Sequence, residues 1–170
     1  SYLIRTPYHN ILVDTCVGNH KTFGGMIAHW GNRDGAFLNN LNNHGIRPEE
    51  IDYVMCTHLH ADHVGWNTRL IDGIWVPTFP NARYLIGEQE FQYWSEVDPG
   101  TLSEDIMGDS IQPVLEAGLV DLVASDHRVC QEVRLESTPG HTPGHVSIRI
   151  ESEGEQALIT GDCIHHPCQI

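Results

Sequence analysis

The segment 57–66 constrains the fold of this chain more than any other part of its sequence. It reads Thr-His-Leu-His-Ala-Asp-His-Val-Gly-Trp and directly follows the apolar run 51–56. The run predicts a buried strand, after which three imidazoles and one carboxylate fall within six positions. Imidazole suits zinc, iron or nickel, and carboxylate also suits manganese. We therefore expect a strand that ends where these side chains converge on a cation.

The order of side chains within this segment supports a shared site. His58 and His60 alternate with apolar residues, so both rings point the same way if the backbone is extended. Asp62 and His63 follow, where a turn directs them toward a second cation. The alternative is a polar loop that is rich in histidine by chance. We favour the metal site, because four ligand-type residues in six positions after a strand are an uncommon coincidence.

Two further segments carry ligand-type side chains at predicted strand ends. Residues 137–145 read Ser-Thr-Pro-Gly-His-Thr-Pro-Gly-His, with His141 after a Pro-Gly turn and His145 at the start of the next strand. Residues 160–162 read Thr-Gly-Asp and end another apolar run. The two histidines compete for a ligand role, and Asp162 is either a ligand or a turn former.

These three segments, in this order, resemble the signature of the metallo-β-lactamase-fold hydrolases. The H-x-H-x-D-H pattern is complete in His58, His60, Asp62 and His63. The resemblance implies an α+β fold, a four-layer αββα sandwich, in which residues 1–170 form a single domain. It also implies that this domain is incomplete at the C-terminus, because members of the family add a helix, a strand and a last histidine.

The resemblance further assigns the candidate ligands to two divalent metal ions, with zinc favoured and iron or manganese as alternatives. The first set is His58, His60 and His141, and the second is Asp62 and His63, with Asp162 bridging both ions. The last histidine of the family has no counterpart here, so the second site is expected to be one ligand short. Asp14, at the end of an N-terminal strand, is expected to hold the metal ligands in position without binding the metal itself.

The implied activity is that of a metal-dependent hydrolase in which a metal-bound hydroxide attacks an ester or lactone, and Asp62 or Asp162 handles the leaving-group proton. Residues 161–167 resemble the branch of acyl-homoserine lactonases and methyl-parathion-hydrolase-like enzymes. His165 in this segment is a candidate substrate contact or a plain loop residue. An organophosphate triester or a β-lactam is a further candidate substrate.

Aromatic residues favour a hydrophobic substrate over a charged one. Trp66 follows the histidine segment directly, and Trp30 and Phe23 lie in a Gly-rich loop at 16–31. These rings are candidate walls of an apolar pocket, although each also fits a place in the core. Two alternatives to a hydrolase remain open, an iron-dependent oxidoreductase of the dioxygenase type and a catalytically inactive metal-binding protein.

Charge and hydropathy limit the classes of partner that this chain is expected to bind. The net charge of −14 argues against nucleic acid, whose phosphates need Lys and Arg. No apolar run approaches the length of a membrane span, so no membrane partner is expected. The expected partner, from the resemblance to hydrolases, is a small-molecule substrate. Five cysteines without close spacing predict free thiols in a reducing, cytoplasmic location, although a targeting segment can have preceded Ser1. The sequence does not predict an oligomeric state.

Hydrophobic patterning and turn residues predict a mixture of strands and helices. The predicted strands are 2–5, 11–14, 51–56, 82–87, 119–123, 129–136, 146–151 and 157–160. The predicted helices are 34–44, 48–50, 88–97 and 111–117, with an irregular hairpin at 66–80 and a loop at 98–108. Such a mixture fits two sheets packed face to face with helices outside.

Overall fold

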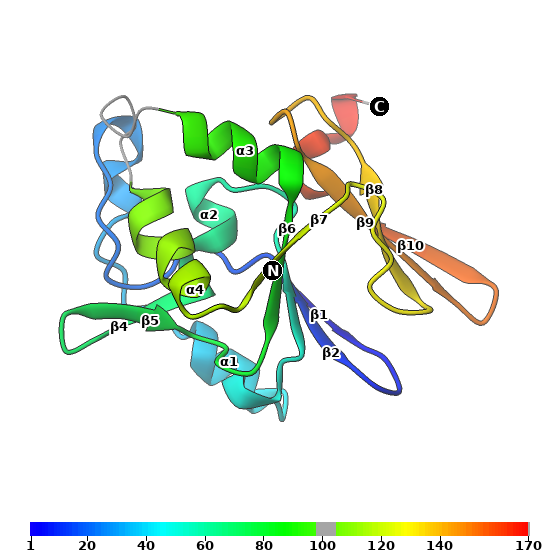
Figure 1. Cartoon of the computed structure of the whole chain (residues 1–170), viewed down its shortest axis with the longest axis horizontal. Coiled ribbons are helices and arrows are strands. Elements are labelled where there is room, and N and C mark those ends of the chain that lie inside the picture. The colour runs from blue at the N-terminus through cyan, green and yellow to red at the C-terminus, as the bar shows by residue number, and fades with distance from the viewer. Residues whose placement is uncertain (98–104, 170) are drawn as a thin grey trace.

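Two sheets pack face to face in the computed structural model, which describes residues 1–97 and 105–169. The larger sheet has five strands in the order β1-β2-β3-β6-β7, and helices cover its outer face (Figure 1). The β1–β2 pair is antiparallel, whereas β2, β3, β6 and β7 run parallel. The strands are β1 (Tyr2–Arg5), β2 (Asn10–Val13), β3 (Tyr53–Met55), β6 (Arg83–Gly87) and β7 (Val120–Val123).

The smaller sheet is antiparallel, in the order β10-β9-β8. Its strands are β8 (Val133–Ser137), β9 (Val146–Ser152) and β10 (Glu155–Ile159). A separate hairpin joins β4 (Thr68–Ile71) to β5 (Ile74–Pro77). Its turn is Asp72-Gly73, and both residues have positive φ, as a tight two-residue hairpin turn requires.

The α-helices are short and lie on one side of the larger sheet. They are α1 (Phe37–Asn43), α2 (Ala61–Val64), α3 (Glu88–Glu96) and α4 (Gln112–Glu116). A π-helical turn, Met107–Ile111, leads into α4. Five 3-10 turns complete the described elements: Gly25–Trp30, Pro48–Glu50, Gly65–Asn67, Gly161–Cys163 and Pro167–Gln169.

The larger sheet separates two hydrophobic cores, because successive side chains of a strand point to opposite faces. One core, on the helix side, contains Leu12 and Val54 together with apolar residues of the helices. The other core, between the sheets, contains Val13 and Met55, which meet Ile148 and its neighbours from the smaller sheet. Both faces of the larger sheet are thus buried, as a parallel sheet requires.

The described residues therefore supply three of the expected four layers: helices, larger sheet and smaller sheet. The outer face of the smaller sheet is polar, with ion pairs between Arg149 and Glu136 and between Arg134 and Glu151. The predicted arrangement of two packed sheets with helices outside is confirmed. All five cysteines are free, as predicted, and no described helix has the length and hydropathy needed to span a bilayer.

Several predicted boundaries were wrong. The helix predicted at 34–44 begins at Phe37, and the strand predicted at 129–136 begins at Val133. Ala61–Val64, which was expected to be a loop, forms one helical turn. The loop predicted at 98–108 lies partly at 98–104, outside the described residues, and Met107 and Gly108 belong to the π-helical turn. The irregular segment at 66–80 contains the regular β4–β5 hairpin.

The site is placed by the strand directions. Because β2, β3 and β6 are parallel, their carboxyl ends lie at the same edge of the larger sheet. Asp14 follows β2, the segment from Thr57 to His63 follows β3, and α3 follows β6 directly. The smaller sheet contributes the loop before β9, with His141, and the turn after β10, with Asp162.

Candidate metal centre

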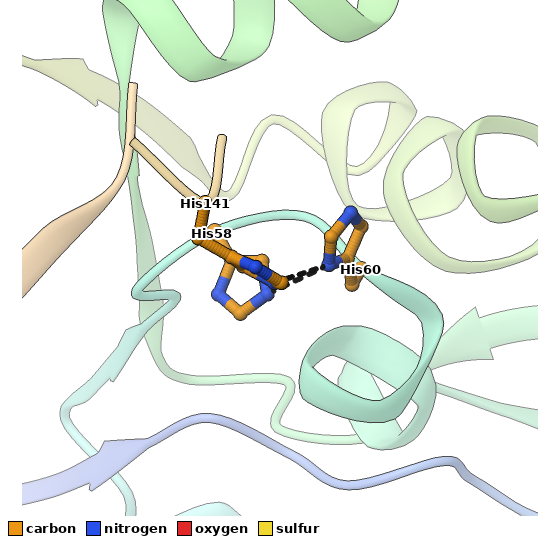
Figure 2. A group of neighbouring side chains, drawn as sticks. All are labelled: His58, His60 and His141. Carbon is orange, nitrogen blue, oxygen red and sulfur yellow. Dashed lines mark hydrogen bonds between the residues drawn. The ribbon is translucent and has the colours of Figure 1, made fainter. Parts of the chain in front are cut away.

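Three imidazoles converge at this edge of the sheets. Nδ1 of His60 lies 3.0 Å from Nε2 of His58 and 2.9 Å from Nε2 of His141 (Figure 2). The ring centroids of the three residues are 4.6 to 4.8 Å apart. His58 is fully buried and His141 is exposed, so the cluster is closed behind and open in front. We call these three residues the histidine cluster.

The proton positions in the histidine cluster follow from the side chains behind it. The hydroxyl of Thr57 donates to the Asp14 carboxylate, 2.9 Å from Oδ2. Its oxygen then accepts from Nδ1 of His58, which lies 3.1 Å away. With Nδ1 protonated, a neutral His58 directs the lone pair of Nε2 toward His60. Asp14 thereby fixes the tautomer of His58 through Thr57.

These proton positions leave lone pairs facing one another. Nδ1 of His60 carries at most one hydrogen, yet it faces Nε2 of both His58 and His141. When all three rings are neutral, at least two of the converging nitrogens present lone pairs to the same point. This donor set fits a divalent cation, because three imidazoles with a further open side are a ligand arrangement of catalytic zinc.

A second group of donors lies beside the first. Nδ1 of His63 donates to Oδ2 of Asp14 at 2.9 Å, which turns Nε2 toward Oδ1 of Asp162, 3.3 Å away. Two lone pairs meet in that last contact unless a proton or a cation lies between them. The potential ligand atoms of His58, His63 and Asp162 all lie within 4.8 Å of one another. The carboxylate of Asp14 thus supports one ligand candidate in each group, as metal-binding histidines commonly require.

Asp62 lies at the margin of this second group. Its Oδ2 is 3.6 Å from Nε2 of His63. Of the described residues, it is not among those whose potential ligand atoms gather within 4.8 Å. The structure thus brings Asp62 next to His63 but places Asp162 closer to it.

Asp162 is held in place by His145. Nε2 of His145 accepts from the backbone N–H of Asp162 at 3.0 Å, and its Nδ1 lies 2.9 Å from Oγ1 of Thr138. Both ring nitrogens are therefore engaged in bonds outside the histidine cluster. His165 faces Asp162 from the other side, with Nε2 3.0 Å from Oδ2. His141, Asp162 and His165 form a third group of potential ligand atoms within 4.8 Å.

Burial favours the neutral forms of His58 and His60. It lowers the pKa of His58 far below the ordinary value, and the neighbouring histidines lower that pKa further. Burial, followed by the proximity of His141, also lowers the pKa of His60. Neutral imidazole is the form that binds a metal ion.

The His63 and Asp162 side chains shift toward their charged forms. Burial opposes a charge on His63, but the hydrogen bond to Asp14 and the nearby carboxylates raise its pKa above the usual value. Burial also opposes a charge on Asp162, but His63 and His165 lower the pKa of this carboxyl group. The two groups thus attract each other across the contact between them.

The aromatic rings that were predicted to line a substrate pocket pack against residues outside the histidine cluster. The Trp66 ring is 7% exposed and stacks on Phe37 at 5.4 Å. Phe23 packs against the helix-side core, and Trp30 lies next to His29 at the end of a 3-10 turn. Among the described residues, the tryptophan ring that packs on the cluster is that of Trp94, edge-on to His60 at 5.4 Å.

Sequence reasoning missed two residues that touch this region. Trp94 and Glu90 lie on α3, where the sequence shows only the apolar spacing of a helix. Glu90 is 2% exposed and accepts hydrogen bonds from both loops that carry the histidine cluster. A buried glutamate leaves no signal in a sequence, because most glutamates on helices face solvent.

The comparisons with known proteins agree with this geometry. The sequence model of the metallo-beta-lactamase superfamily matches residues 1–170, so the chain belongs to this superfamily. An N-acyl homoserine lactonase from Bacillus sp. is 30% identical over 162 residues, covering 89% of this chain and 58% of the lactonase. The chain thus spans somewhat more than half the length of the curated relatives that it matches first.

Solved structures show the same fold. A probable metal-dependent hydrolase from Staphylococcus aureus superposes with a TM-score of 0.78 at 24% identity, over 94% of this chain and 56% of that chain. An N-acyl homoserine lactone hydrolase with N-hexanoyl-L-homoserine at its catalytic metal centre gives a TM-score of 0.65 at 25% identity. That match covers 89% of this chain and 57% of the hydrolase. The predicted metallo-β-lactamase fold is confirmed.

Proposed function

We propose that this protein is a metal-dependent hydrolase that opens a hydrophobic lactone or cleaves a related ester. The observation that carries the proposal is the convergence of His58, His60 and His141, which directs at least two nitrogen lone pairs at one point. The name of the Bacillus relative, an N-acyl homoserine lactonase, supports a lactone as the substrate. The product bound at the metal centre of the structurally similar hydrolase supports the same class.

We assign the ligand roles from the two groups of donors. The histidine cluster would hold one divalent cation, His63 with Asp62 would hold a second, and Asp162 would bridge the two. The imidazole-rich first set favours zinc, and the carboxylates also suit iron or manganese. Two such cations would activate a water molecule as the nucleophile and polarise the carbonyl that it attacks.

The protein's own side chains would orient the reaction and move its proton. Asp162 is about three-quarters buried and is fixed through its backbone by His145, so its carboxylate keeps one direction. Asp62 is more exposed, so a leaving group at the open side would be able to reach its carboxylate. Either carboxylate can pass the proton to the alkoxide that leaves when the lactone ring opens.

His165 is the best placed of the proposed substrate contacts. Its side chain is 53% exposed, and its Nε2 is 3.0 Å from Oδ2 of Asp162. With Nε2–H donating to Asp162, Nδ1 of this ring can accept a hydrogen bond from a substrate at the mouth of the site. Trp30 and Phe23 remain candidate walls, whereas burial of Trp66 against Phe37 favours a packing role for this ring.

The proposal is tested with zinc-loaded, full-length protein and a panel of acyl lactones, p-nitrophenyl esters, a phosphotriester and a β-lactam. We expect the lactones or esters to be hydrolysed, and activity to disappear in His60→Ala. Wild-type protein that holds metal at the cluster but cleaves none of these compounds would contradict a hydrolase. Iron after purification together with oxygen consumption would instead support the dioxygenase-like alternative.

A further inference from the structure

The helix that follows β6 sends one carboxylate between the two loops of the histidine cluster. Glu90 on α3 is buried, and its Oε1 accepts from the backbone N–H of Leu59 at 2.9 Å. Leu59 lies between His58 and His60 in the sequence. This bond therefore fixes the backbone of the first loop at the point where both of its histidines depart.

The other oxygen of Glu90 binds the second loop. Oε2 accepts from the hydroxyl of Thr142 at 2.7 Å and from the backbone N–H of Gly144 at 3.0 Å. Thr142 directly follows His141 and is itself buried. One carboxylate thus joins two loops whose contact residues lie more than 80 positions apart in the chain.

The close approach of the second loop to α3 is a separate observation. A Cβ on Gly144 would lie 2.2 Å from the backbone nitrogen of Glu90, so only glycine permits this contact. The second half of the Thr-Pro-Gly-His-Thr-Pro-Gly-His segment, which supplies none of the ligands proposed above, therefore docks the loop on the helix. His145, its last residue, holds the backbone of Asp162.

Glu90 also orients the ring that packs on His60. Nε1 of Trp94, one helical turn further on, donates to Oε1 at 2.8 Å, and the Trp94 ring stands edge-on to His60. The carboxylate then has four donors, which is the number that its oxygens can accept. Three of the four donors are N–H groups that cannot act as acceptors.

We propose that Glu90 is a positioning residue that sets the distance between the His58–His60 loop and the His141 loop, and thereby sets the metal affinity of the histidine cluster. This inference rests on the proposed metal site, but it concerns a residue that touches neither metal nor substrate. Its carboxylate acts through the backbone of both loops and through the Trp94 ring. An amide cannot replace it, because an NH2 group would face N–H donors.

The test compares Glu90→Gln with Asp109→Asn, which makes the same change at a partly buried carboxylate that binds Lys21 instead. Zinc affinity is measured by competition with a chelator, and the cobalt-loaded protein is compared by its visible spectrum. We expect Glu90→Gln to bind zinc about 10- to 100-fold more weakly and to change the cobalt spectrum. Asp109→Asn should lower the unfolding temperature without either change.

Two further variants keep the inference testable if Glu90→Gln does not fold. Thr142→Val removes one hydrogen-bond donor to Glu90 at nearly constant side-chain volume. Gly144→Ala pushes the His141 loop away from α3. Both should weaken zinc binding. Zinc affinity equal to wild type in Glu90→Gln, or in Thr142→Val where Glu90→Gln is unfolded, would overturn the inference. If His60→Ala also left zinc affinity unchanged, the proposed metal site itself would fail.

Discussion

Polar side chains are buried in two regions of this molecule, at the strand ends and between the β4–β5 hairpin and the π-helical turn. The second region, which we call the lysine cluster, contains Lys21, Thr68, Asp109 and Ser110. Nζ of Lys21 lies 2.8 to 3.0 Å from four oxygens of the other three residues and 3.7 Å from the centroid of the Trp75 ring. Every proton of this ammonium group has an acceptor.

The histidine cluster differs in the balance of donors and acceptors. Its nitrogens face one another, and at least one lone pair has no proton to meet. Burial of polar groups is therefore not by itself a sign of function. A network that satisfies itself holds the fold together, whereas a network with surplus lone pairs needs a cation. Changes in each region should accordingly affect different measurements.

The largest effect is expected from His60→Ala. The loss of a proposed direct ligand should weaken zinc binding by more than the roughly 10- to 100-fold typical of a supporting residue. His145→Ala is the matched control, because this ring bonds Thr138 and the Asp162 backbone and not the facing nitrogens of the histidine cluster. Chelator competition measures both variants. A greater loss of affinity in His145→Ala would reverse the ligand assignment.

In the lysine cluster, Lys21→Met should lower the free energy of unfolding by about 3 kcal/mol, because it leaves the partly buried Asp109 carboxylate without its partner. Urea unfolding measures this loss. Zinc affinity should not change. The double variant Lys21→Met with Asp109→Leu should recover much of the stability. A loss of zinc affinity in Lys21→Met would show that the two regions are coupled.

The contribution of the lysine cluster to the free energy of unfolding should also change at alkaline pH. Burial lowers the pKa of Lys21 to about 8, although Asp109 opposes this shift. Between that pKa and the ordinary lysine value of 10.5, the unfolded chain binds more protons than the folded one. Lys21 should therefore make the protein more stable as pH rises through this window, by at most about 1.4 kcal/mol per pH unit.

This contribution is isolated by comparing wild type with Lys21→Met at each pH. Burial raises the pKa of Cys56 to about 12, so unfolding becomes easier above pH 9 in both proteins. The difference in unfolding free energy between them should grow between about pH 8 and pH 10.5. A constant difference would contradict the lowered pKa of Lys21.

The smallest effect is expected from a pair of glycines with positive φ. Gly161→Ala and Gly118→Ala should each lose about 1 kcal/mol of stability, because alanine is strained at φ +55° and +69°. Only at Gly161 would the new Cβ meet another group, Nε2 of His145 at 2.7 Å. Gly161→Ala alone should therefore shift Asp162 and weaken metal binding. Equal zinc affinity in the two variants would show that the turn at Gly161 can move without disturbing metal binding.

The sequence predicted the fold and the proposed ligands best where the signal is local. His58, His60 and His63 fall within six positions after an apolar run, so their pattern is visible in the printed chain. The Asp72-Gly73 turn was equally local, and the hairpin it forms could have been recognised as regular. The single turn of α2 could not, since four residues are too few to show a helical period.

The sequence could not predict contacts that depend on packing between distant segments. Glu90 and Lys21 look like ordinary solvent-exposed charges in a helix and a loop, and only the fold buries them. The choice between His141 and His145 also depended on tertiary geometry. His141 faces His60, whereas His145 faces Thr138 and the Asp162 backbone.

The central claim is that His58, His60 and His141 bind one divalent cation together. Anomalous diffraction at the zinc edge from metal-loaded crystals tests it most directly. We expect a peak bonded to one nitrogen of each of the three rings, at roughly 2.0–2.1 Å. A loaded crystal with no peak among these rings, or with zinc held only by other residues, would contradict the account.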